Sequence, residues 1–347
     1  MRLRCGSFGS LPDGRCAGLF TLENAAGMSV TLTDFGARVV RLLVPDAKGR
    51  LRDVALGQDS LKAYLEDEQY FGAVCGRVAN RISGAAFRLG GTVHRLPRQA
   101  GGHTLHGGPN GFHRRLWRCE ILEDGLRFIY DSADGEEGFP GALRVSAAYR
   151  LGEDNRLCIA YEAAADADTP VNLTNHCYFN LAGHDCGDVL AQELMIPADF
   201  YTPVDEALLP TGEVLSVADT PFDFRVSKPI GRDIGLPHPQ LLCGGGYDHN
   251  FVLRKSEREA LTLAARAADP AGGLALEVWT TAPGLQLYTA NGLRSVAGKD
   301  GALYGPRAAF CLETQYFPDS LRHTHFPSPV LRAGERRVCG TEFRFIS

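Results

Sequence analysis

The segment Met28-Ser29-Val30-Thr31-Leu32-Thr33 alternates apolar and polar side chains with a period of two. Such alternation places successive side chains on opposite faces of an extended chain, so it predicts a strand with one buried face. Residues 37–44 repeat the pattern less strictly and predict another strand.

Two hairpins are predicted further along the chain. Gly90-Gly91-Thr92 separates residues 87–89 from residues 93–96, and Asp124-Gly125 separates residues 119–122 from residues 126–130. Turns of this composition between β-rich segments indicate hairpins. Further β-rich runs cover residues 143–149, 157–162, 259–265 and 274–280, the last two joined by a turn at 269–273.

Strand candidates recur every 8–15 residues or so along the whole chain, and the 40 glycines and 19 prolines are spread evenly between them. Residues 60–70 are one of the few predicted helices, and residues 200–248 are proline-rich and irregular. No linker or charge block divides the chain. The sequence therefore predicts an all-β fold, a large β-sandwich with few short helices, forming one domain over residues 1–347.

The composition excludes several classes of protein. Of 347 residues, 44% are hydrophobic and 22% are charged, which is typical of a globular chain and not of a disordered one. The net charge of −5 argues against nucleic acid as a partner, since that binding needs a basic face. No apolar run approaches the roughly 18 residues of a membrane span, and the first residues lack the apolar stretch of a signal peptide. We therefore expect no membrane partner.

The ten cysteines form no Cys-x-x-Cys pair, so their spacing fits neither a zinc site nor a thioredoxin motif. In a large chain without a secretion signal, free cysteine mostly serves as a small buried apolar residue. We therefore predict reduced thiols and a cytoplasmic location.

Five segments place polar side chains next to predicted turns, and each alone has a purely structural interpretation. Glu313 follows the apolar residues 308–312, and a carboxylate inside such a strand is costly unless it is paired or functional. If residues 175–180 form a strand, His176, Tyr178 and Asn180 share one face. The five segments are 76–82, 104–112, 172–183, 247–253 and 312–319.

Other motifs predict no function. His103, His106 and His113 lack the spacing of a zinc protease, and no metal site is expected. No helix follows Gly244-Gly245-Gly246, and the dinucleotide and hydrolase glycine motifs are absent.

Together the five segments resemble the aldose 1-epimerases, also called galactose mutarotases. Gly-Arg-Val-Ala-Asn-Arg-Ile, Leu-His-Gly-Gly, Thr-Asn-His-x-Tyr-Phe-Asn-Leu, Tyr-Asp-His-Asn-Phe-Val-Leu and Leu-Glu-Thr-Gln occur in the family's order, and residues 284–289 match a further segment, Gly-Leu-Gln-x-Tyr-Thr. The resemblance runs from about Leu19 to Phe345 and implies the family's galactose mutarotase-like supersandwich.

The resemblance also implies an activity and a site. An aldose 1-epimerase is an isomerase that interconverts α and β anomers of free aldoses such as galactose and glucose, with neither cofactor nor metal. The resemblance assigns the role of base to Glu313 and the role of acid to His176. It places His106 on the ring-oxygen side of the sugar, where His106 could share the acid role. Asp248 is expected to grip sugar hydroxyls, Asn80, Arg81 and Gln286 to position the remaining ones, and Tyr178 to support His176.

Two departures from the family concern loops: Gly111-Phe112-His113-Arg114-Arg115 replaces a frequent Gly-Phe-Asp, and Thr289-Ala290-Asn291-Gly292-Leu293 lacks a frequent phenylalanine. Both could alter the sugar preference.

Three alternatives stay open at this stage. A hexose-6-phosphate 1-epimerase would need further arginine or lysine near C6. A non-catalytic carbohydrate-binding module would stack sugars on exposed aromatics, whereas this chain has two tryptophans, and Trp279 falls in an apparent core strand. A glycoside hydrolase would need two facing carboxylates. The expected partner is a monosaccharide, and the expected assembly a monomer or weak homodimer.

Overall fold

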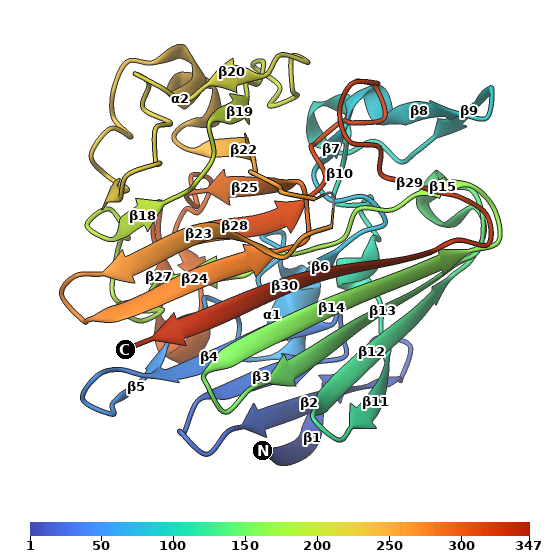
Figure 1. Cartoon of the computed structure of the whole chain (residues 1–347). Helices are drawn as coiled ribbons and strands as arrows, with labels where there is room; N and C mark the ends of the chain where they lie inside the picture. The colour runs from blue at the N-terminus through green and yellow to red at the C-terminus, as the bar shows by residue number, and fades with distance from the viewer. Residues whose placement is uncertain (258) are drawn as a thin grey trace.

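The structure, a computed structural model, describes residues 1–257 and 259–347. It consists of strands with two short helices, as predicted (Figure 1). Within the described residues, no helix is long and apolar enough to cross a membrane.

The largest sheet has nine strands, which run across the molecule in Figure 1. In sheet order these are β11 (Arg118–Leu122), β12 (Gly125–Ser132), β13 (Leu143–Leu151), β14 (Arg156–Ala165), β30 (Arg336–Ile346), β24 (Leu274–Thr280), β23 (Thr262–Asp269), β18 (Glu193–Met195) and β21 (Lys228–Pro229). Burial alternates along β14, where Leu157, Ile159 and Tyr161 face the core. The alternation of apolar and polar residues along the strand therefore determines which face of the sheet packs against the core.

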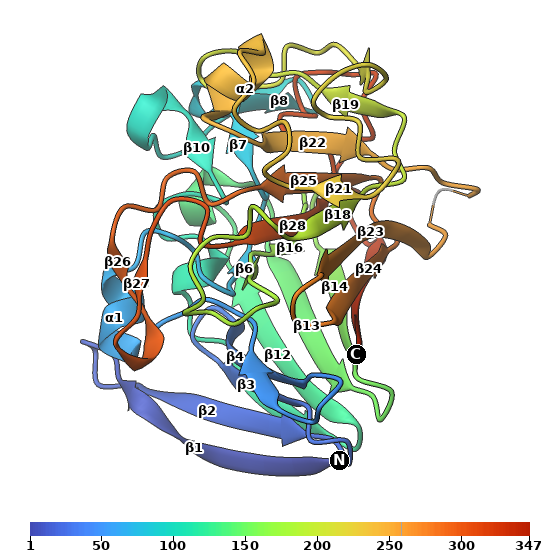
Figure 2. The ribbon, with the colours of Figure 1, turned by 90° about the vertical axis from the view of Figure 1, so that its left-hand side faces the viewer.

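Two further sheets lie behind the first, as the turned view shows (Figure 2). One contains β1 (Arg2–Ser10), β2 (Cys16–Glu23), β3 (Ser29–Thr33), β4 (Arg38–Pro45) and β5 (Leu51–Asp53). The other contains, in sheet order, β17 (Tyr178–Phe179), β28 (Phe310–Gln315), β25 (Gly284–Tyr288), β22 (Asp248–Val252), β19 (Phe200–Thr202) and β20 (Leu215–Ser216). A bridge between Ala55 and Phe179 joins the two sheets. One core cluster holds Val30, Val145 and Leu285, one residue from each of the three sheets.

Shorter elements connect these sheets. The strand pairs are β6 (Val74–Cys75) with β16 (Thr174–Asn175), β7 (Arg81–Ile82) with β10 (Thr104–Leu105), β8 (Ala86–Leu89) with β9 (Thr92–Arg95), β15 (Thr169–Pro170) with β29 (Val330–Leu331), and β26 (Val296–Ala297) with β27 (Leu303–Tyr304). The helices are α1 (Leu61–Glu66) and α2 (Pro239–Gly244), and single 3-10 turns cover Ser83–Ala85, Ala100–Gly102, Phe112–Arg114, Glu136–Gly138 and Lys299–Gly301.

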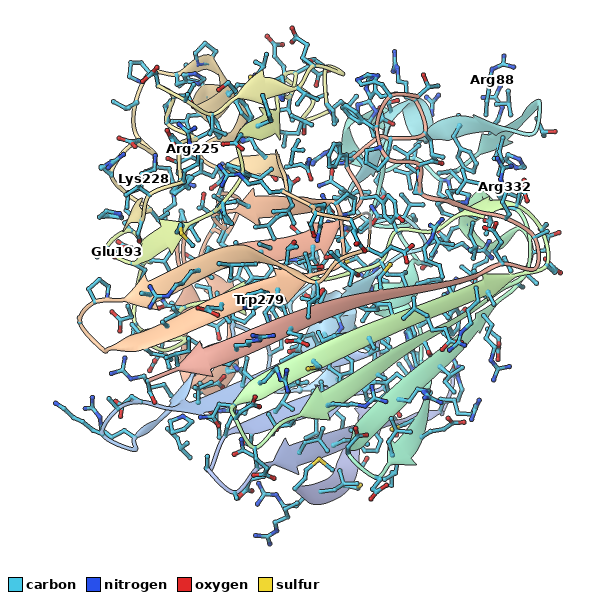
Figure 3. All side chains as sticks on the ribbon, in the orientation of Figure 1. Arg88, Glu193, Arg225, Lys228, Trp279 and Arg332 are labelled. Carbon is cyan, nitrogen blue, oxygen red and sulfur yellow. The ribbon has the colours of Figure 1, made fainter. Side chains whose placement is uncertain are left out.

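Most local expectations are confirmed. Both hairpins form, as β8–β9 and β11–β12, and helix α1 occupies six residues of the predicted segment, capped by the Ser60 hydroxyl. Trp279 lies in a core strand, as predicted, but its side chain is not in the core. Its strand β24 is central, but Trp279 shares the outward face with Glu277, accepts the Arg344 guanidinium on its ring at 4.5 Å and lies on the outer side of the sheet (Figure 3).

Gly107, next to the predicted site residue His106, has a conformation that only glycine adopts at this position. Its φ is +84°, and a Cβ atom there would lie 1.8 Å from the carbonyl oxygen of Gly76. The Gly107→Ala variant should lose about 3 kcal/mol or more, because left-handed strain of roughly 1–2 kcal/mol adds to an overlap that costs roughly 1–3 kcal/mol. Denaturant unfolding measures this loss.

The matched control is Gly84→Ala. Gly84 has φ +61°, but a Cβ atom added there would have no neighbouring atom within 4 Å, so this variant tests backbone strain alone. Equal destabilisation by the two variants would contradict the steric explanation for Gly107.

Candidate active site

A cleft of about 470 Å³ opens where strands β22, β25 and β28 meet the ends of β7, β10 and β17. All the predicted site residues except Gln286 line it: Asn80, Arg81, His106, His176, Tyr178, Asp248 and Glu313. These residues come from segments far apart in sequence, and the fold brings them to one hollow.

The strand register places both carboxyl groups on the same side of the sheet. Gln286 pairs directly with Asn250 on one side and with Glu313 on the other. Asp248 lies two residues before Asn250 and therefore shares its face. The opposite face carries Phe251, Leu285 and Leu312 into the core, so packing of the apolar face holds the polar face still.

Glu313 and His176 form a buried acid–base pair. The Nε2 atom of His176 lies 3.7 Å from the Oε1 atom of Glu313, and the two side chains are 5% and 3% exposed. The other polar atoms of the pair, His176 Nδ1 and Glu313 Oε2, are buried without a hydrogen-bond partner among the described residues. A bound ligand or water at the cleft would supply the hydrogen bonds that these buried atoms lack.

Burial sets the protonation of this pair. Removal from water raises the pKa of Glu313 well above its usual range, and the neighbouring Asp248 carboxyl raises it further. The same loss of solvent lowers the pKa of His176 to about 4. Opposite shifts in two adjacent groups are typical of an acid–base site.

Two tyrosine rings fix the plane of the His176 ring. Tyr178 stacks on it at 5.0 Å and Tyr70 at 5.9 Å, both with interplanar angles of 18°. The main chain of His176 is anchored as well, since its N–H donates to the Ala73 carbonyl and its own carbonyl accepts from Gly72. His176 and Tyr178 thus lie on the same wall of the cleft, as predicted, although a break between β16 and β17 interrupts the expected strand.

A hydrogen bond from Gln286, which lies on the side of Asp248 away from the cleft, orients the Asp248 carboxylate. Gln286 donates from Nε2 to the Asp248 carboxylate at 2.7 Å, and Gln315 donates to the Gln286 carbonyl oxygen at 3.4 Å. Burial raises the pKa of Asp248, and the positive charge of Arg81 opposes that rise. Gln286 is 3% exposed and lies behind Asp248, outside the lining of the cleft.

His106 and Asn80 are joined by two hydrogen bonds, both of which use the main chain of Asn80. The His106 N–H donates to the Asn80 carbonyl at 3.0 Å, and the Asn80 N–H donates to the His106 Nδ1 atom at 3.2 Å. Both residues adopt positive φ, 50° for His106 and 62° for Asn80. Strained backbone held by surrounding structure is common at functional sites.

Distance alone makes one group of side chains a candidate for metal binding. One ligand atom each from His106, His176 and Glu313 lies within 4.8 Å of the others, and all three residues are buried. Two histidines and one carboxylate are a ligand set that transition metals accept.

Several lining residues were not predicted. Tyr288 lies two residues after Gln286 in a segment that the family motif covers, so alternation could have indicated it. Asn291 lines the cleft and donates to the carbonyl of Gly244, which holds the end of helix α2 against the rim. Tyr70 follows helix α1 with a φ of 60°, for which the sequence has no signal.

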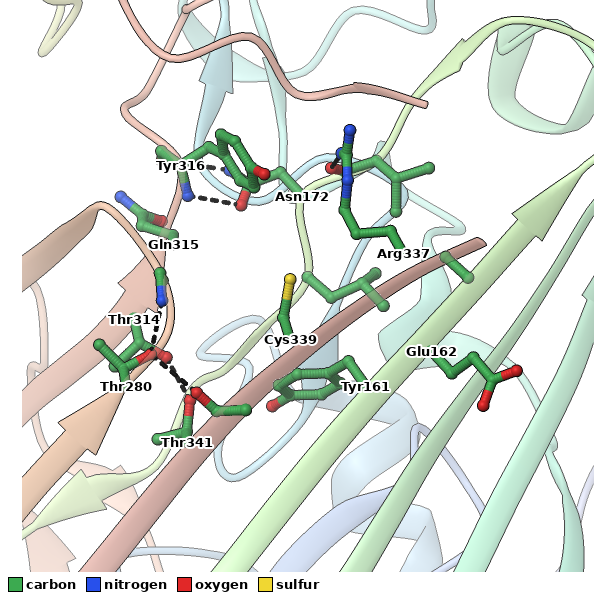
Figure 4. Close-up of a pocket in the computed structure, with 15 residues that line it drawn as sticks. Tyr161, Glu162, Asn172, Thr280, Thr314, Gln315, Tyr316, Arg337, Cys339 and Thr341 are labelled. Carbon is green, nitrogen blue, oxygen red and sulfur yellow. Dashed lines mark hydrogen bonds between the residues drawn. The ribbon is translucent and has the colours of Figure 1, made fainter. Parts of the chain in front are cut away.

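A separate hollow of about 20 Å³ lies beside strand β28, between Tyr161, Gln315 and Cys339 (Figure 4). It has room for about one water molecule and is too small for a sugar. The larger cleft, which the predicted residues line, is therefore the candidate site.

The geometry defines a class: a β-sandwich protein with a polar cleft that can hold a small molecule beside a buried pair of proton-exchanging side chains. Comparison with known proteins agrees. The model of the aldose 1-epimerase family matches residues 18–344. The chain is 43% identical to human galactose mutarotase over 340 residues and 40% identical to Escherichia coli aldose 1-epimerase over 339, with 97% of each chain covered.

Solved structures give the same result. An aldose epimerase homologue from C. elegans superposes with a TM-score of 0.88 at 31% identity, covering 95% of this chain and 99% of that one. Galactose 1-epimerase from Lactobacillus acidophilus gives 0.85 at 28% identity, covering 99% and 98%. The chain belongs to the aldose 1-epimerase family, and the predicted family and supersandwich fold are confirmed.

Proposed function

We propose that this isomerase interconverts the α and β anomers of free aldoses such as galactose and glucose, with Glu313 as the base and His176 as the acid. The observation that supports this assignment is the buried Glu313–His176 pair in the cleft, with unpartnered polar atoms on both side chains. The reaction needs one group to take a proton and one to give a proton, and the pair supplies both.

The reaction proceeds in two mirrored steps. The Glu313 carboxylate takes the proton of the hydroxyl on C1, the C1–O5 bond breaks, and O5 takes a proton from the imidazolium of His176. The aldehyde then rotates about the C1–C2 bond. On closure, His176 takes the proton back from O5, which attacks the other face of C1, and Glu313 returns its proton to O1.

The pair holds one proton over a wide range of pH, because burial lowers the pKa of His176 and raises that of Glu313. Without sugar, that proton resides on Glu313. This is also the protonation state that follows ring opening. A closed sugar favours the other state, since its O1 hydroxyl donates a hydrogen bond to the Glu313 carboxylate.

The remaining polar residues hold the sugar while C1 swings. Asp248, oriented by Gln286, accepts hydrogen bonds from hydroxyl groups. Arg81 and the Asn80 side chain serve as donors, and Asn80 Oδ1 is already used by the Arg81 N–H at 2.7 Å. Tyr178 supports the plane of His176. Such positioning lowers the entropic part of the barrier.

The direct test is polarimetry on freshly dissolved α-galactose and α-glucose. The protein should bring the rotation to equilibrium far faster than buffer alone. No acceleration with any free aldose would overturn the proposal, and release of reducing sugar from glycosides would indicate a hydrolase instead.

The same experiment decides the phosphorylated alternative. Among the described residues that line the cleft, Arg81 is the only lysine or arginine. An adjoining hollow of about 420 Å³ shares Arg81 and adds Arg114. We expect free hexoses to react faster than hexose 6-phosphates, and the reverse order would assign the enzyme to the phosphorylated class.

The dependence of kcat/KM on pH should follow the one-proton pair. Below about pH 4 both groups are protonated and no base remains, whereas above the raised pKa of Glu313 no acid remains. Initial rates corrected for spontaneous mutarotation measure this profile. An acid limb near the ordinary histidine pKa of about 6.5 would contradict the assignment.

We also propose that the enzyme works in the cytoplasm and that residues 1–347 form one domain. All ten cysteines are free, and Cys5, Cys16 and Cys186 are exposed, which suits a reducing compartment. The main core cluster runs from Leu22 to Phe345, which supports a single folding unit. The monomeric or weakly dimeric state stays a prediction.

A further inference from the structure

The two hydrogen bonds between Asn80 and His106 determine more than the position of the His106 ring. In one of them, the ring is the acceptor: the main-chain N–H of Asn80 donates to His106 Nδ1 at 3.2 Å. A main-chain amide cannot reverse this role, because its hydrogen is fixed in the peptide plane. The Nδ1 atom must therefore present a lone pair.

A neutral imidazole carries one hydrogen, so a lone pair on Nδ1 places that hydrogen on Nε2. A second proton on Nδ1 would point at the Asn80 N–H and break the bond. The surroundings oppose that proton too: burial lowers the pKa of His106 well below its usual range, and His176, His113 and Arg81 lower it further. Tyr70, whose ring lies 4.6 Å away, is uncharged. Glu313, with a ligand atom within 4.8 Å of one from His106, holds its own proton without sugar because burial raises its pKa.

We infer that the Asn80 main-chain N–H locks His106 as the Nε2–H tautomer, which makes His106 a permanent hydrogen-bond donor to a sugar oxygen and removes it from proton transfer. The part of this inference that concerns a sugar rests on the proposed function, whereas the tautomer of His106 is independent of it. Asn80 is the positioning residue, and it acts through His106.

This fixed tautomer of His106 separates the roles of the two histidines. The rings of His106 and His176 lie 5.1 Å apart, yet their second nitrogens differ. The Nδ1 atom of His106 accepts a fixed hydrogen bond, whereas Nδ1 of His176 has no partner among the described residues. His176 can therefore gain and lose a proton without opposing a main-chain group, and His106 cannot.

The fixed tautomer of His106 also argues against metal binding by the candidate metal site. A histidine that binds a metal through one nitrogen normally donates its other N–H to an acceptor. His106 would have to bind through Nε2, and its Nδ1 faces a donor. The set of His106, His176 and Glu313 therefore satisfies the distances of a metal site but not its hydrogen bonding.

The test is the nitrogen NMR spectrum of protein labelled in its histidine rings. The expected result for His106 is a protonated Nε2 and an unprotonated Nδ1 that do not titrate between about pH 5 and pH 9. A proton on Nδ1, or a titration of His106 in that range, would overturn the inference. Because the spectrum is recorded without sugar, it decides the tautomer even if the enzyme acts on no aldose.

Kinetics of two matched variants tests the consequence. His106→Gln replaces the Nε2 donor with an amide N–H, whereas His106→Asn keeps an acceptor for Asn80 but loses the distal donor. We expect kcat/KM to fall less than about tenfold in the first and on the order of 10²-fold in the second, the usual cost of one lost donor. The shape of the pH profile should not change in either.

Equal losses in both variants would contradict the donor role of Nε2, and a missing limb in the pH profile would mean that His106 transfers protons. Asn80→Gly serves as the control, because it removes the side chain and keeps the main-chain N–H. The His106 ring signals should be unchanged in that variant, and a switch of tautomer would show that the Asn80 side chain sets it instead.

Discussion

The Glu313→Gln variant should lose turnover by about 10³-fold or more while it still binds sugar. Glutamine is nearly isosteric with glutamate, so the hydrogen bonds that hold the sugar elsewhere in the cleft stay in place. The amide cannot take the O1 proton, and a well-placed base contributes on the order of 10²–10⁴ in rate. Polarimetric kcat and calorimetric binding of galactose measure the two quantities separately.

The same variant should be more stable than the wild type, which separates the loss of activity from misfolding. The pKa of Glu313 is higher in the folded protein than in the unfolded chain. The folded state therefore holds the proton more tightly, and its stability falls as pH rises from the unfolded pKa towards the folded pKa. The gain in melting temperature should be small at pH 4 and larger at pH 8. Near-wild-type turnover would place the base elsewhere.

The His176→Asn variant should lose kcat by on the order of 10²–10⁴, because O5 then leaves C1 without a proton donor. Asparagine cannot reach Glu313 as the Nε2 atom does at 3.7 Å. The limb of the pH profile near pH 4 should disappear, because His176 no longer titrates. Stopped-flow polarimetry on α-galactose gives both the rate and the profile.

Tyr178→Phe is the matched control for His176→Asn. Phenylalanine preserves the ring that stacks on His176 at 5.0 Å and removes only a hydroxyl group. It should retain most of the activity. A loss as large as that of His176→Asn would show that proton donation to O5 needs the hydroxyl of Tyr178 as well as the imidazole, which would contradict the assignment of His176 as the sole acid.

Features set by local interactions were predictable from sequence. Strand β3 followed from alternation, the β8–β9 hairpin from its glycines, and the cost of a carboxylate among apolar neighbours drew attention to Glu313. Helix α2 was missed although it carries two local signals, Pro239 in its first turn and Gly245 after its last residue.

Features set by long-range pairing were not predictable. The position of Gln286 behind Asp248 depends on the register between β22 and β25, and that of Tyr70 on a left-handed main chain. The outward face of Trp279 depends on which side of β24 is covered. The roles given to Glu313 and His176 came from the family resemblance, and their proximity could be known only from the assembled sheets.

The cross-strand row that ends at Glu313 has a consequence for how this enzyme matures. Gln286 and Asn250, the other residues of this row, lie on separate strands, and His176 lies in a segment over a hundred residues earlier in the chain. A fragment of the polypeptide that ends before Glu313 lacks one member of the pair. When the protein refolds after dilution from denaturant, we therefore expect activity to return only once strand β28 has paired. Nascent chains that still lack β28 should have no activity.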